Sequence, residues 1–200
     1  MKLSDTHILE KMAAGQIIIS PRVPDEQIGS FSVDLKLGNH FRIFKHTECP
    51  PFIDLGTPDS LFAMCDQFME EVFVKDNEPF YLHPGELALG ITAERMTLPN
   101  DIAGWLDGRS SLARLGLMIH VTAHTIDPGW DGHITLEFAN IGKLPLALRP
   151  GMRICAVSFE PLSGPTSQPY CQKHGAKYQG QESPLSSRID KDTGLPGVQG

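Results

Sequence analysis

The residues best suited to chemistry lie in one short segment, Arg109–Arg114, which reads Arg-Ser-Ser-Leu-Ala-Arg. Two arginines flank two serine hydroxyls, and Asp107-Gly108 forms a predicted turn before them. Hydroxyls and backbone N–H groups at the start of a helix, together with guanidinium groups, are donors that proteins use to hold a phosphate. The segment therefore predicts an anion-binding site on a capped helical turn. The alternative is an ordinary helical turn whose arginines face solvent.

A second candidate is a predicted hairpin, in which Ile119–Ala123 leads through a turn at 127–132 into the strand His133–Phe138. Side chains alternate along a strand, so His133, Thr135 and Glu137 share one face. A carboxylate on the wall of a closed cavity would have a raised pKa, which suits general acid–base catalysis, and a nearby guanidinium would lower that pKa again. The other interpretation is that this face of a half-buried hairpin meets solvent.

The cysteines favour reduced thiols over a metal site. Cys49, Cys65, Cys155 and Cys171 form no Cys-x-x-Cys pair and match no zinc-ribbon spacing. The segment His83-Pro84-Gly85-Glu86 is only superficially similar to the His-x-Glu of zinc deaminases, because no paired thiolates follow it. We therefore expect neither disulfides nor zinc.

The elements that must position these residues are mostly strands. A helix is predicted over residues 5–14, and a second, short helix near Ser60–Glu71. Apolar and polar residues alternate from Phe31 to Ile43, where Gly38-Asn39 predicts the turn of a hairpin. Pro-Gly and Asp-Gly turns separate further predicted strands, which are Phe80–Leu82, Leu87–Ala93, Met118–His124, His133–Asn140, Pro145–Leu148 and Ile154–Phe159. Their regular spacing predicts a sandwich or closed barrel.

The composition agrees with one β-rich domain that carries a tail. The 200 residues include 19 Gly and 16 Pro, which is turn-rich, while 40% of the chain is hydrophobic and can build a core. After Pro161 large apolar residues become rare. We predict a barrel domain over residues 1–160, an arm over 161–192 and a disordered tail over 193–200.

Charge and hydropathy exclude several classes of protein. A net charge of −7 argues against binding to nucleic-acid polymers, which needs a basic surface, so an anionic ligand must meet a local cationic pocket. No apolar run approaches the ~18–20 residues of a membrane span. The first residues, Met1–His7, lack the pattern of a secretory signal. We therefore expect a cytoplasmic protein that does not bind a membrane.

Five segments of the chain resemble bacterial dCTP deaminases. They are Gly104–Gly116 (GWLDGRSSLARLG), Thr122–Trp130 (TAHTIDPGW), Leu136–Asn140 (LEFAN), Lys143–Gly151 (KLPLALRPG) and Phe159–Pro165 (FEPLSGP). The resemblance extends from the N-terminal helix to about Asp192 and is densest over residues 81–165. It implies the mainly β fold of the trimeric dUTPase-like superfamily, a distorted jelly-roll β-barrel whose active sites lie between the subunits of a homotrimer.

The resemblance also implies a set of site residues. Glu137 matches the catalytic glutamate of the family; Ser110 and the backbone of Ala123 would orient the attacking water, and Arg114 would keep Glu137 ionised. Tyr170, Lys177 and Gln181 would close over the triphosphate. The substrate-binding residues it implies are Arg109, Ser110, Ser111, Leu112, Ala113, Arg114, Asp127, Thr135, Leu136, Glu137, Tyr170, Lys177 and Gln181. Mg²⁺ would be bound through the triphosphate rather than by protein side chains.

The implied reaction converts dCTP and water to dUTP and ammonia, which supplies dUMP for thymidylate synthesis. Inhibition by dTTP is also implied, with Val121–His124 as the segment that moves. Two alternatives stay open: an enzyme that also cleaves dUTP, or only cleaves it, to give dUMP, and a barrel that senses nucleotides without turnover. Thr125 stands where the family pattern has Arg, which puts affinity or regulation in doubt rather than catalysis by Glu137.

Overall fold

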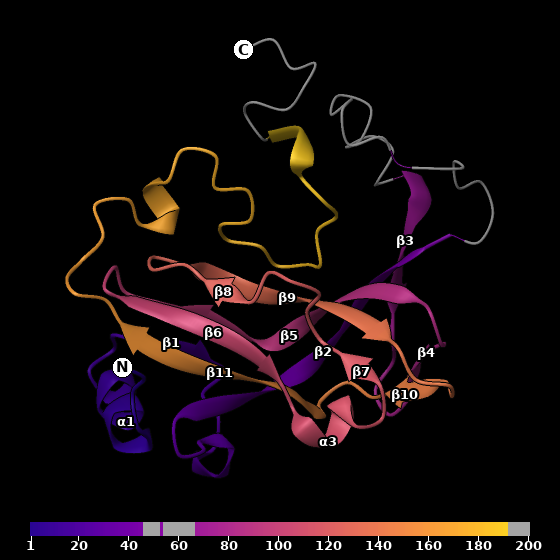
Figure 1. Cartoon of the computed structure of the whole chain (residues 1–200), viewed down its shortest axis with the longest axis horizontal. Coiled ribbons are helices and arrows are strands. Elements are labelled where there is room, and N and C mark those ends of the chain that lie inside the picture. Colours follow the sequence, from indigo (N-terminus) through magenta and orange to yellow (C-terminus); the bar gives the residue numbers. More distant parts are fainter. Residues whose placement is uncertain (46–52, 54–66, 192–200) are drawn as a thin grey trace.

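Most strands of the chain belong to one curled antiparallel sheet (Figure 1). The computed structural model describes residues 1–45, 53 and 67–191. Within these residues the strand order is β7-β9-β5-β2-β11-β6-β8, β1 and β3 pair with β5 and β2, and β4 and β10 form a separate pair. The strands are β1 (Ile18–Ser20), β2 (Ser32–Phe44), β3 (Met69–Phe73), β4 (Phe80–Leu82), β5 (Leu87–Thr97), β6 (Ile102–Gly108), β7 (Leu117–Met118), β8 (Thr125–Ile126), β9 (Asp131–Asn140), β10 (Leu146–Leu148) and β11 (Arg153–Pro161).

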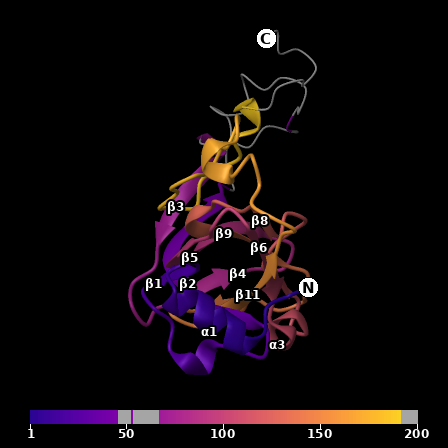
Figure 2. The ribbon, with the colours of Figure 1, turned by 90° about the vertical axis from the view of Figure 1, so that its left-hand side faces the viewer.

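The sheet curls around an apolar interior, which confirms the predicted mainly β, barrel-like fold (Figure 2). Alternating side chains of β2 and β9 supply fully buried residues, among them Leu35, Phe41 and Phe138. The ring of Phe41 stacks on that of Phe80 with centroids 4.2 Å apart. Turns and short helices complete the barrel; they are α1 (Asp5–Ala13), α3 (Ser110–Ala113) and three 3₁₀ turns, η1 (Asp25–Gln27), η2 (Tyr170–Gln172) and η3 (Ile189–Lys191).

The N-terminal helix is confirmed close to its predicted bounds. Ile8 faces the core of the barrel and is fully buried, while Gly15 ends the helical segment with a positive φ of 68°. Of the second predicted helix, residues 60–66 lie outside the described part of the chain, residues 67–68 are helical, and Met69–Glu71 begin strand β3. No helix in the described ranges is long and apolar enough to cross a membrane.

The predicted hairpin around Gly38-Asn39 is wrong, because β2 is one continuous strand from Ser32 to Phe44. The register of β2 against β5 shifts between Leu37 and Phe41, so the glycine lies in an irregular stretch of the strand rather than in a turn. A Cβ atom at Gly38 would lie 2.9 Å from the carbonyl oxygen of Ile91. The glycine is therefore needed for the close approach of β5.

The predicted strand Met118–His124, and with it the hairpin to His133–Phe138, is also wrong. Leu117–Met118 pairs with the end of β9, but Thr125–Ile126 pairs with β6 at the other end of the strand order. The residues between them, 119–124, form no regular strand. This segment therefore crosses from one edge of the curled sheet to the other and passes over β9, where the Glu137 N–H donates to the carbonyl oxygen of Ile119 (3.0 Å).

Side chains replace backbone hydrogen bonds where β5 is irregular. Its register against β9 shifts between Ile91 and Arg95. The hydroxyl of Thr92 accepts a hydrogen bond from the Ile134 N–H (3.0 Å) and donates to the carbonyl oxygen of Glu94 (2.7 Å). The carboxylate of Glu94 accepts from the N–H of Lys36 on β2 (2.8 Å). Two buried polar side chains thus hold together the strands that carry the site.

Candidate active site

A cavity of about 450 Å³ lies between β9, the crossing segment and the arm that follows β11. Its wall is mostly apolar, with Leu106, Trp130 and Tyr170 among the contributors. The carboxylates of Asp127 and Glu137 are its charged groups, and none of the described residues that line it is a lysine or arginine. The cavity can therefore enclose a flat, largely apolar group such as a base, but it offers no cation for a phosphate.

Glu137 reaches this cavity because of the period-two pattern of β9. Burial alternates along the strand, so Thr135 and Glu137 point to the cavity while Leu136 and Phe138 are fully buried in the core. The N–H of Val121 donates to Oε2 of Glu137 (2.9 Å). The crossing segment thus orients the carboxylate, and Leu136 does not line the cavity.

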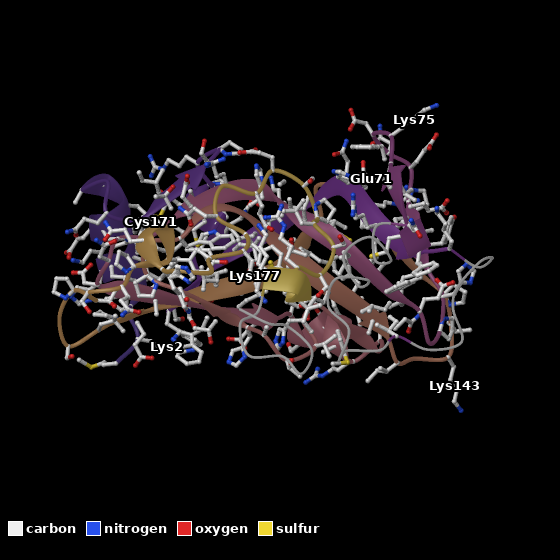
Figure 3. The ribbon with its side chains drawn as sticks, turned by 90° about the horizontal axis from the view of Figure 1, so that it is seen from above. Lys2, Glu71, Lys75, Lys143, Cys171 and Lys177 are labelled. Atoms are coloured by element: carbon white, nitrogen blue, oxygen red, sulfur yellow. The ribbon has the colours of Figure 1, made fainter. Side chains whose placement is uncertain are left out.

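The arm lies above β8 and β9 (Figure 1), and its residues Tyr170, Tyr178 and Gln181 are among those that line the cavity. The Tyr170 ring packs against Trp130 with centroids 5.2 Å apart, and its hydroxyl accepts hydrogen bonds from the N–H groups of Lys177 (3.2 Å) and Tyr178 (3.1 Å). Lys173 forms an ion pair with Asp127 at 3.1 Å. Seen from above, Lys177 lies over the middle of the barrel (Figure 3). Tyr170 is therefore the centre around which the first half of the arm folds.

The segment Arg109–Arg114 lies far from this cavity within one chain. Figures 1 and 2 both show α3 at the end of the barrel opposite the arm. α3 is only four residues long, and the residue that precedes its first turn is Arg109 rather than a serine. The Arg109 guanidinium lies 3.4 Å from the carboxylate of Asp34, which also faces Arg153 at 3.6 Å. Ser110 and Arg114 are exposed.

The cavity therefore unites one part of the predicted site and leaves the other outside. Around it lie Ala123, Asp127, Thr135, Glu137, Tyr170 and Gln181. Outside its wall lie Arg109, Ser110, Ser111, Leu112, Ala113, Arg114, Leu136 and Lys177. The sequence reasoning missed Lys173, because a lysine in a polar tail carries no local signal of its partner. Thr125 lines the cavity and is exposed.

Neither of the two described cysteines lines this cavity. Cys155 is fully buried, which raises the pKa of its thiol far above the ordinary value, whereas Cys171 is exposed. Cys49 and Cys65 lie outside the described residues. In residues 1–45 and 67–191, no group of three or more His, Cys, Asp or Glu side chains is placed to hold a metal ion.

Comparison with known proteins gives concordant matches in sequence. A family model described as dCTP deaminase-like matches residues 2–162. A curated dCTP deaminase of Psychromonas ingrahamii is 56% identical over 195 residues, which are 96% of this chain and 100% of that protein.

The fold is also that of a solved structure at lower identity. The crystal structure of the 2'-deoxycytidine 5'-triphosphate deaminase from Agrobacterium tumefaciens superposes with a TM-score of 0.60 at 22% identity, over 80% of this chain. The match covers 48% of that longer chain. A dUTPase of EIAV matches 48% of this chain and 78% of its own, at 25% identity and a TM-score of 0.40.

Proposed function

The chain belongs to the dCTP deaminase-like family, and on that premise we propose that it hydrolyses dCTP to dUTP and ammonia in the cytoplasm. The observation that carries the proposal is the placement of Glu137. Its carboxylate lies on a mostly apolar cavity wall, with one oxygen oriented by the Val121 N–H. A carboxylate has further lone pairs that can accept a proton from a water molecule at this position.

The proposed chemistry needs one carboxylate that acts first as base and then as acid. Glu137 takes a proton from the water as the water oxygen bonds to C4 of the cytosine ring. It then delivers this proton to the ring nitrogen N3. A second proton, from the new C4 hydroxyl, passes through the carboxylate to the amine, the C4–N bond breaks, and ammonia leaves as the C4 carbonyl forms. Ser110 and the backbone of Ala123 are proposed to orient the water, and Thr135 to face the base.

The triphosphate requires cations that the cavity wall does not supply. Asp127 and Glu137 make the wall acidic, so the phosphates must extend away from it toward other groups. Lys177 in the arm is one proposed partner, and Mg²⁺ bound through the phosphates would neutralise part of the charge. Arg109 and Arg114 are the others, but in one chain they lie at the opposite end of the barrel.

We infer that a second copy of the chain brings α3 to the cavity, as in a homotrimer with its sites between subunits. Two exposed apolar side chains beside α3 support such a contact: Leu115 is 62% and Ile141 73% exposed. They lie close together, because the Ile141 N–H donates to the carbonyl oxygen of Gly116 (2.9 Å).

Mixing two inactive variants tests this assembly. Glu137→Gln and Arg114→Ala are refolded together from denatured protein at equal amounts. If each site takes Glu137 from one subunit and Arg114 from the next, random trimers regain about a quarter of the wild-type sites. Activity that stays at the level of either variant alone would show that one chain provides both residues.

The crossing segment is also the proposed point at which dTTP inhibits. Residues 119–124 form no regular strand, and Val121 is exposed although its N–H orients Glu137. A nucleotide that shifts Val121–His124 would therefore remove the hydrogen bond that holds the carboxylate. Inhibition by dTTP, measured as a loss of ammonia release, should weaken when this segment is shortened.

Ammonia release and product analysis test the main proposal. The wild type should form ammonia and dUTP in equal amounts. Glu137→Gln should lower kcat by at least about 100-fold while dCTP still binds, because the glutamine oxygen can accept from Val121. Glu26→Gln, on the exposed turn η1, is the matched control and should leave kcat unchanged.

The other outcomes separate the competing functions. Formation of dUMP and pyrophosphate would indicate an enzyme that cleaves the triphosphate. Binding of dCTP by the wild type without turnover would indicate a sensing barrel, in which Thr125 is the residue to restore to Arg. Full activity of Glu137→Gln would remove Glu137 from its proposed role.

A further inference from the structure

Gln181 presents a buried, unpaired acceptor to the cavity. The side chain is only 6% exposed, and its Oε1 has no hydrogen-bond partner among the described residues. Its Nε2 donates to the carbonyl oxygen of His133 (2.7 Å), and the N–H of His133 donates back to the Gln181 carbonyl oxygen (3.1 Å). The amide nitrogen and the backbone are thus fixed, and Oε1 is left for a donor on the bound molecule.

The next residue, Glu182, ties this part of the arm to the barrel. Its carboxylate contacts the guanidinium of Arg95 on β5 and lies 3.5 Å from Nε2 of His133. Arg95 also forks onto Asp131 at the start of β9, with N–O distances of 3.0 and 2.6 Å. These hydrogen bonds lower the pKa of Asp131 below its ordinary value. Arg95 therefore holds β9 and the arm at one point.

Glu182 does not line the cavity that contains Glu137, so its side chain is not placed to touch a molecule bound there. Its side chain is 66% exposed and is directed toward Arg95 and His133 on the barrel. Glu182 can act on a ligand in the cavity through Gln181, because the two residues are neighbours in the chain. The Gly180 N–H, which donates to the Asp131 carbonyl oxygen (2.7 Å), completes this short docking segment.

We propose that Glu182 is a positioning residue, which together with Arg95 holds the arm closed and keeps the Gln181 amide in place over the nucleotide. The proposal rests on the proposed function only for the identity of the ligand, dCTP. A half-exposed ion pair would stabilise the closed arm only weakly. The ratio of closed to open arm should therefore change by a factor of roughly two to five when one partner loses its charge. Apparent affinity falls by the factor by which the competent state is depleted.

The test compares Glu182→Gln, which keeps the shape of the side chain, with Glu10→Gln on the exposed face of α1. Glu182→Gln should raise the KM for dCTP by roughly two- to five-fold and leave kcat within about two-fold. In nucleotide-free protein it should also speed hydrogen exchange at the Gly180 and His133 amides, because these amides are freed when the arm opens. Glu10→Gln should change neither quantity.

A double-mutant cycle with Gln181→Ala tests whether Glu182 acts through Gln181. In a Gln181→Ala background, Glu182→Gln should raise KM by a smaller factor, because one of the groups that it positions is gone. A KM increase of the same size in both backgrounds would overturn the proposal, as would unchanged KM and exchange in the single variant. If the wild type releases no ammonia from dCTP, the proposed function fails by itself, and the exchange rates of the nucleotide-free protein still decide whether Glu182 holds the arm.

Discussion

Thr92 holds the irregular part of β5 against β9, and its replacement by valine tests how the fold carries Glu137. The side chain is 1% exposed. Its hydroxyl accepts from the Ile134 N–H at 3.0 Å and donates to the Glu94 carbonyl oxygen at 2.7 Å. Ile134 lies three residues before Glu137 on the same strand, so this hydroxyl fixes the strand that presents the carboxylate.

The magnitude follows from the groups left without partners. Valine has nearly the shape of threonine, so Thr92→Val removes the hydroxyl and preserves the packing. It leaves a buried N–H and a buried carbonyl oxygen unpaired, at about 1–3 kcal/mol each, and the free energy of unfolding should fall by about 2–6 kcal/mol. For a chain of this size that lowers Tm by at least about 4 °C.

The measurement is denaturant unfolding of Thr92→Val beside Thr92→Ser and the wild type. Serine keeps the hydroxyl and loses one methyl group, and should cost about 1 kcal/mol. Thr92→Val should therefore be less stable than Thr92→Ser, although valine is closer to threonine in shape. Thr92→Val with wild-type stability, or with more stability than Thr92→Ser, would refute the claim that this hydroxyl replaces ladder hydrogen bonds.

Three further predictions concern the barrel. Burial raises the pKa of Glu94 above its ordinary value of 4.5, so the folded protein retains a proton that the unfolded chain releases. The free energy of unfolding of the wild type should therefore fall as pH rises from about 4.5 through the folded pKa, whereas that of Glu94→Gln should not. If urea unfolding gives the same pH dependence for both proteins, the raised pKa does not belong to Glu94. Cys155 should react with iodoacetamide only after unfolding, because burial raises the pKa of its thiol. The exposed Cys171 should react already in the native protein, and peptide mass spectrometry distinguishes the two sites. Gly90→Ala places a Cβ 2.4 Å from an aromatic carbon across the sheet and should cost about 1–3 kcal/mol in denaturant unfolding, while Gly29→Ala, with 3.6 Å to its nearest atoms, should cost less.

Alternating burial made the strand that carries Glu137 predictable from the sequence. β9 alternates along its whole length, so the faces of Thr135 and Glu137 could be read from the pattern. β6 was not predicted, because Ile102–Gly104 are all buried and no period-two pattern appears. Gly38 suggested a turn for a related reason: a glycine required by a neighbouring strand has the same local sequence signal as one required by positive φ.

The site could be predicted in part for equally physical reasons. Motifs identify which residue types belong to a site, and the cavity does contain Glu137, Asp127 and Gln181. They do not show which chain supplies each residue. The contact between Lys173 and Asp127 spans 46 positions in the sequence, and no periodic pattern connects the two.

The acidic cavity and the distant arginines together explain how a protein of net charge −7 can act on a highly charged nucleotide. A cavity with a carboxylate and no cation repels a triphosphate by itself, so one chain alone is poorly suited to bind the substrate. Arginines brought by another subunit would supply the attraction only in the assembled protein. In that assembly the carboxylate of Glu137 would face an arginine of the neighbouring subunit.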